Sequence, residues 1–96
     1  MVRQVDWRHG ADHIWDRHKV MVSEADEALA DVDAVWFDPD PKSKSGRSIR
    51  VIGYCGSRRE LLTVILLREP GADWLWGANA WPSNPTDRAM YREGNE

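Results

Sequence analysis

The sequence predicts one α+β domain over residues 1–96, with two N-terminal helices, an antiparallel sheet of three or four strands and a C-terminal helix. Three observations lead to this fold class. A length of 96 residues fits one hydrophobic core. Two apolar runs flank the dipeptide Gly56-Ser57, as in a β-hairpin. Apolar residues at helical spacing, beside capping residues, occur before this hairpin and after it.

Two helices are predicted in the N-terminal third. The first covers residues 11–18 and follows a break at Gly10. The second runs from about residue 24 to residue 31, with Ser23 as the expected N-cap and Asp26 as the acidic partner of a capping box. The residues of the first helix that should face inward are Ile14, Trp15 and His18.

The sheet is predicted to centre on the hairpin at residues 47–68. Residues 61–67 are apolar at successive positions, which is typical of a central strand, whereas residues 47–54 mix apolar with polar side chains and should lie nearer an edge. A short strand is expected at residues 34–37. Arg50 alternates with apolar neighbours, so its side chain should point to the opposite face of the sheet.

The C-terminal third predicts one more strand and the last helix. The strand is expected over residues 73–81 and the helix over residues 85–92. Asn84 can cap this helix, and Asp87 stands where a capping carboxylate would sit. Gly94 is a natural stop.

The chain is acidic, with a net charge of -3, but its charges are segregated. Residues 24–40 contain seven acids and no base, and residues 42–59 contain six bases and no acid. Such segregation forms either one cationic surface that attracts phosphate or two solvated faces. The six bases are Lys42, Lys44, Arg47, Arg50, Arg58 and Arg59.

Composition excludes several classes of protein. With 42% hydrophobic and 30% charged residues, the chain is neither disordered nor membrane-embedded, and we expect no signal peptide. The single cysteine, Cys55, excludes an internal disulfide and favours the cytoplasm. His9 and His13 have the spacing of a zinc pair, but Gly10 interrupts it and no protease glutamate follows. We therefore predict no metal and no cofactor.

Three short motifs occur in a distinctive order: Arg17-His18-Lys19-Val20 before Glu24-Ala25, then Val51-Ile52-Gly53, then an acid, an arginine and a tyrosine at Asp87, Arg88 and Tyr91. Together they resemble the BrnT-type toxins of bacterial toxin-antitoxin pairs, over residues 7–91. The resemblance implies a RelE-like fold and ribonuclease activity. It also implies a partner, an antitoxin that carries a DNA-binding domain.

The implied reaction is metal-independent cleavage of RNA, in which the 2'-hydroxyl attacks the adjacent phosphate. It needs a base, a proton donor and cations that bind the phosphate. His18 is the candidate base because histidine titrates near neutrality, and Tyr91 is the candidate donor. Arg50 and Arg88 are the candidate phosphate ligands. Further RNA contacts are predicted for Arg47, Arg58, Arg59 and Asn79.

Three of these catalytic candidates also have a structural interpretation. His18 can cap the end of its helix, where an imidazolium meets the negative end of the dipole. Arg88 can form a surface ion pair. Tyr91 can pack its ring and leave its hydroxyl in water. Arg50 is the residue that we favour most for function.

Six tryptophans are more than a small core usually needs. Trp15 and Trp36 are expected in the core. In the last strand, Trp74 and Trp76 should lie on one side and Trp81 on the other, where they can stack RNA bases or contact a protein partner.

Trp81 stands where the BrnT-type toxins have an arginine, and the chain is acidic. These two features favour a second hypothesis, a non-catalytic module that kept the fold and binds a protein through this strand. Self-association is left open.

Overall fold

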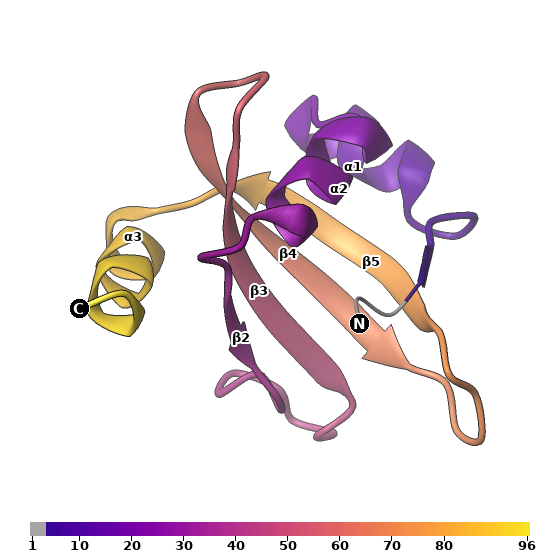
Figure 1. The fold of residues 1–96 in the computed structure, drawn as a ribbon. Coiled ribbons are helices and arrows are strands. Elements are labelled where there is room, and N and C mark those ends of the chain that lie inside the picture. The colour runs from indigo at the N-terminus through magenta and orange to yellow at the C-terminus, as the bar shows by residue number, and fades with distance from the viewer. Residues whose placement is uncertain (1–3) are drawn as a thin grey trace.

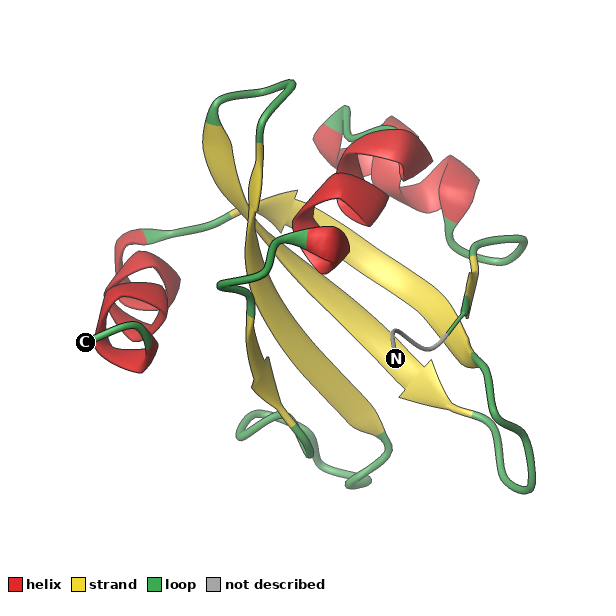
Figure 2. Ribbon diagram, in the orientation of Figure 1, coloured by secondary structure: helices red, strands yellow, loops and turns green. Residues whose placement is uncertain are grey.

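The structure is a computed structural model and describes residues 4–96, which form three helices and one five-stranded sheet (Figures 1 and 2). The elements are β1 (Val5–Asp6), α1 (Ala11–His18), α2 (Val22–Ala30), β2 (Val35–Phe37), β3 (Ser48–Cys55), β4 (Glu60–Arg68), β5 (Leu75–Pro82) and α3 (Pro85–Gly94). The α+β class and the order of the helices are confirmed. Within residues 4–96, no helix has the length and hydrophobicity needed to cross a bilayer.

The strands lie in the order β1-β5-β4-β3-β2, and all neighbours are antiparallel except β1, which runs parallel to β5. β4 is central and β3 has only the short β2 outside it, as the apolar patterns predicted. The expected three or four antiparallel strands were too few. The missing strand, β1, has two residues, which is too short to produce a periodic signal.

One face of the sheet packs against α1 and α2 and forms the main core. Its buried residues come from alternate positions of β3 and β4, as the two-residue period of a strand requires. α2 approaches β3 so closely that a Cβ on Gly53 would collide with the backbone of Ala28, and Gly77 leaves room for the ring of Trp7 in the same way. The core residues that alternate on these strands include Ile49, Val51, Leu62, Val64 and Leu66.

The opposite face is only half covered, because α3 packs on β2 and β3 at one side of the sheet (Figure 1). On β4 and β5, several side chains of this face stay partly exposed. We call this region the open half-face and define it as Ile65, Leu67, Trp76, Asn79 and Trp81.

A shift in strand pairing places Trp76 and Trp81 on the same side of the sheet. Leu66 pairs with Gly77, but Ile65 pairs with Asn79, so β5 contains one extra residue between the two pairs. The prediction that Trp76 and Trp81 face opposite sides was therefore wrong, because one inserted residue reverses the alternation.

Two tryptophans expected in the core lie at the surface. Trp15 is 50% exposed on α1, beside the fully buried Ile14, and the Lys19 Nζ lies 5.1 Å from its ring. Trp36 is 40% exposed because it lies on the three-residue edge strand β2. The tryptophan that enters the core is Trp7, which is 6% exposed.

The helix ends agree with the predictions in part. α1 covers the expected residues 11–18, and the Asn84 side chain caps α3 by accepting the Asp87 N–H at 2.8 Å. α2 begins earlier than predicted, with Met21 at the N-cap, and Glu24 Oε1 accepts the Met21 N–H at 2.8 Å. The predicted Ser23 cap was therefore wrong. Ser23 lies inside the helix, and the capping hydrogen bond joins Glu24 to the Met21 N–H instead.

Candidate functional site

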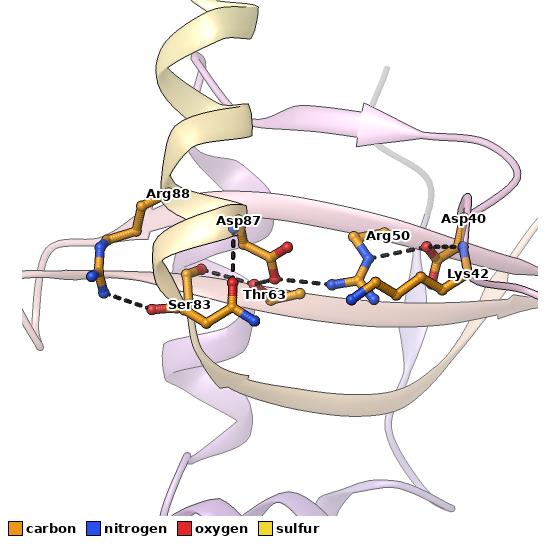
Figure 3. Close-up of polar contacts among 8 residues, drawn as sticks. Asp40, Lys42, Arg50, Thr63, Ser83, Asp87 and Arg88 are labelled. Atoms are coloured by element: carbon orange, nitrogen blue, oxygen red, sulfur yellow. Dashed lines mark hydrogen bonds and ion pairs between the residues drawn. The ribbon is translucent and has the colours of Figure 1, made fainter.

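Arg50 lies at the centre of a buried ionic network between the sheet and α3 (Figure 3). It points to the α3 side of the sheet, as its alternation with Ile49 and Val51 predicted. Its Nε lies 3.0 Å from Asp40 Oδ1 and its Nη1 lies 2.9 Å from Asp87 Oδ2. The exposed fractions of the three side chains are 7% for Arg50, 6% for Asp40 and 0% for Asp87. Two carboxylates therefore share one guanidinium out of contact with bulk water.

Asp87 connects this ion pair to two hydroxyl groups. Thr63 Oγ1 donates a hydrogen bond of 2.7 Å to Asp87 Oδ2, and Thr63 Oγ1 lies 2.8 Å from Ser83 Oγ. The other carboxylate oxygen, Oδ1, is buried without a hydrogen-bond partner in the part of the chain that the structure describes. The carboxylate of Asp87 thus points at the sheet, and only its backbone N–H takes part in the cap that the sequence predicted.

The network limits what Arg50 can do chemically. Two carboxylates share the single guanidinium, so they offset its charge and make its attraction for a phosphate weaker than that of an unpaired arginine. The third guanidinium nitrogen, Nη2, remains available to bind a ligand. Within residues 4–96 it makes no hydrogen bond, and it is not fully buried. The main role of Arg50 in this structure is to hold α3 and the Asp40 loop on the sheet.

The ring of Trp81 has both Arg50 and His18 as neighbours. The Arg50 Cζ lies 5.6 Å from the centre of the Trp81 ring, and the His18 ring lies 5.9 Å from it, tilted by 46°. His18 ends α1, which packs along β5, so a helix at the sheet edge brings an imidazole to the open half-face. Asn79 lies on the same face, and its Oδ1 accepts the Ala80 N–H at 2.9 Å.

The other two residues of the predicted catalytic cluster lie elsewhere. Arg88 donates from Nη1 to the Ser83 carbonyl oxygen at 2.8 Å and points away from Arg50, on the far side of Asp87 (Figure 3). The Tyr91 hydroxyl donates to Asp31 Oδ2 at 2.7 Å. Of the four predicted residues, His18 and Arg50 share one neighbour, the Trp81 ring.

The environment of Tyr91 makes its phenol a weak acid. Burial and the hydrogen bond to the Asp31 carboxylate raise the pKa of Tyr91 to about 12. Burial opposes ionisation of Asp31 as well, but hydrogen bonds from the Tyr54 and Asp33 N–H groups and from Tyr91 outweigh it and lower the pKa of Asp31. The hydrogen bond between Tyr91 and Asp31 joins α3 to the C-terminal end of α2.

Two of the six bases in residues 42–59, Arg50 and Arg58, form ion pairs with acids of the chain itself. Arg58 pairs with Glu24 at 3.3 Å and with Glu60 at 2.7 Å, so it fastens the hairpin to α2. Arg47 donates from Nη2 to the Arg68 carbonyl oxygen at 3.1 Å. Arg59 is exposed in the hairpin turn. These positions do not combine with the buried Arg50 into one cationic surface.

Residues 4–96 contain no group of three or more metal-binding side chains. His9 lies beside Trp76, with ring centres 5.0 Å apart, whereas His13 lies beside His18 at 6.1 Å. Cys55 is buried, and burial raises the pKa of its thiol, so it is poorly suited to act as a nucleophile.

No protein-family model matches the chain, and no curated protein matches it.

Sequence reasoning missed Asp40, Thr63 and Ser83, which complete the Arg50 network. Asp40 belongs to a run of acids that ends in a proline-rich turn, and no spacing connects it with Arg50. The only available signal was indirect. A buried arginine needs a carboxylate partner, and Asp87 was the acid already expected in the first turn of the last helix.

Proposed function

We propose that this protein is a cytoplasmic ribonuclease with a RelE-like fold, the toxin of a toxin-antitoxin pair related to the BrnT-type toxins. The observation that supports this proposal is that His18 and Arg50 both lie beside the Trp81 ring, at 5.9 Å and 5.6 Å from its centre. This arrangement combines an imidazole, a guanidinium and an aromatic ring, the three kinds of group that bind and cleave single-stranded RNA.

In the proposed reaction, an RNA base binds against Trp81 and the adjoining phosphate lies between His18 and the Nη2 of Arg50. The imidazole of His18 takes the proton of the 2'-hydroxyl, whose oxygen attacks phosphorus. The bond from phosphorus to the 5'-oxygen then breaks, and this oxygen receives a proton from the imidazolium. The products are a 2',3'-cyclic phosphate and a 5'-hydroxyl, and no metal is required.

The structure changes the roles proposed for the remaining residues. Arg50 acts mainly as a positioning residue, since it is held by Asp40 and Asp87 and in turn lies over Trp81. Arg88 and Tyr91 stabilise α3 through Ser83 and Asp31. Asn79 is the polar group of the open half-face that is best placed to contact a base.

The test is cleavage of single-stranded RNA by the purified protein, with His18→Ala beside His9→Ala. His9 is an exposed histidine that lies beside Trp76 and serves as the matched control. We expect His18→Ala to lower the cleavage rate by about 10² to 10⁴ and His9→Ala to leave it unchanged, with both variants folded by circular dichroism. Fragments should carry 2',3'-cyclic phosphate ends. Equal cleavage rates in the two variants would refute this site but not the proposed nuclease activity.

The second candidate function is the non-catalytic module that binds a protein through its tryptophan-rich strand. Two observations favour it: Arg50 is neutralised by two carboxylates, and the chain carries a net charge of -3. If the folded parent neither cleaves RNA nor arrests growth when it is expressed in a bacterial host, the module becomes the better explanation.

A further inference from the structure

A second aromatic site lies where β1 meets β5, away from His18 and Arg50. The rings of Trp74 and Trp76 are 6.0 Å apart and nearly perpendicular, at 88°. They line an open groove of about 440 Å³, together with Gln4, Asp6, Arg8 and Asp73. This volume lies within the range of about 300–1,000 Å³ that is typical of small-ligand sites.

The groove already contains a cation from the chain itself. The Arg8 Cζ lies 5.7 Å from the centre of the Trp76 ring, and Arg8 Nη2 lies 2.8 Å from Asp6 Oδ2. The Arg8 Nε is also within 3.1 Å of Asp6 Oδ2. A guanidinium therefore lies over an indole with a carboxylate at its edge, which combines cation–π attraction with charge-assisted hydrogen bonds.

Arg8 is exposed enough to be displaced from the Trp76 ring by a second cation. Its side chain is 68% exposed. The Asp73 carboxylate forms no ion pair within residues 4–96, and Glu69 Oε2 lies 3.4 Å from the Trp76 Nε1 as a third carboxylate beside the rings. Two acids, Asp6 and Asp73, and one base, Arg8, thus line the groove, so its lining carries an excess of negative charge.

We propose that this groove binds an arginine side chain from a basic peptide segment of a partner protein. Arginine fits better than lysine because a planar guanidinium can lie flat on an indole and donate two parallel hydrogen bonds to a carboxylate. Arg8 displays this arrangement within the molecule and competes for the same ring. The site does not depend on the ribonuclease proposal, because it uses none of His18, Arg50 and Trp81.

The experiment is an NMR titration of the full chain that follows the indole N–H signals of the tryptophans. The probe is the peptide acetyl-Gly-Arg-Gly-amide, and its control carries citrulline, which has the same shape without the charge. We expect the arginine peptide to shift the signals of Trp74 and Trp76 and the citrulline peptide to shift neither. Trp74→Leu assigns one signal and replaces a partly exposed side chain, so it should not disturb the core.

Two charge variants make the test specific. Arg8→Gln removes the internal competitor and should lower the Kd of the arginine peptide by about two- to fivefold, the equivalent of an exposed cation–π contact. Asp73→Asn should raise the Kd at low salt, whereas Asp12→Asn, an exposed acid on α1, should leave it unchanged. The proposal is overturned by equal binding of the citrulline peptide, by no shift at millimolar arginine peptide, or by no gain in affinity in Arg8→Gln.

Discussion

The buried network predicts that removing Arg50 lowers the free energy of unfolding more than removing the charge of one of its two acids does. Arg50→Met leaves both Asp40 and Asp87 buried without a cation, at 6% and 0% exposure. Asp87→Asn leaves Arg50 paired one to one with Asp40. The introduced amide oxygen can still accept from Arg50 or Thr63, so this change removes charge and keeps most of the hydrogen bonds.

The expected magnitudes follow from the burial of these groups. Removing one partner of a buried ion pair costs about 3–5 kcal/mol, and Arg50→Met should lie at the upper end because it strands two carboxylates. Asp87→Asn should cost about 1–3 kcal/mol, the effect of weakening buried hydrogen bonds to a charged group. A domain has a total stability of about 5–15 kcal/mol, so a loss of about 5 kcal/mol in Arg50→Met removes roughly a third or more of it.

Urea unfolding followed by tryptophan fluorescence measures these differences. Arg92→Met is the matched control, since Arg92 is exposed on α3 and forms no ion pair within the described residues, and it should change the free energy of unfolding by less than about 1 kcal/mol. Adding Asp87→Asn to Arg50→Met should restore part of the lost stability, because one stranded carboxylate is removed. The reasoning is refuted if Arg50→Met costs no more than Arg92→Met, or if the double variant is less stable than Arg50→Met.

Two further predictions concern the contacts that hold α2 and α3 on the sheet. Tyr91→Phe should cost about 1–2 kcal/mol at pH 7 by removing the hydrogen bond to Asp31. The pKa of Tyr91 is about 12 in the folded protein, against an ordinary value of 10.0, so this contribution to stability is complete below pH 10 and is lost as the pH rises through 12. The free energies of unfolding of parent and variant should therefore converge near pH 12, and a constant difference would contradict the prediction. Gly53→Ala should cost at least about 2 kcal/mol because its Cβ meets the Ala28 backbone. Gly56→Ala, whose Cβ would make only an ordinary van der Waals contact with Glu27 Oε1 at 3.7 Å, should stay within about 0.5 kcal/mol. Equal thermal stability of the two would be inconsistent with the close packing of α2.

Local signals were sufficient to predict most of the helices and strands. The start of α1 after Gly10, the Asn84 cap of α3 and the central position of β4 were all predicted correctly. Each depends on residues within one turn or one strand, where periodicity and capping chemistry act directly. The two-residue strand β1 was missed because its hydrogen bonds to β5 come from a segment about 70 residues away.

The candidate site was predicted only in part. Alternation along β3 correctly sent Arg50 to the face opposite Ile49 and Val51. Its partners came from positions 10 residues before it and 37 residues after it, at Asp40 and Asp87. No local pattern connects such distant residues, so the same arginine that resembled a phosphate ligand became the centre of a buried ion network.

The sequence alone determined which side chains share a face with their near neighbours, because strand and helix periods are properties of the backbone. Only the tertiary structure decided which residues form the candidate site. One extra residue in β5 turned Trp81 to the side of Trp76, and the packing of α1 along β5 brought His18 to it. Register and helix packing are settled by burial summed over the whole core, and a shift of one residue in either exchanges the buried and the exposed set.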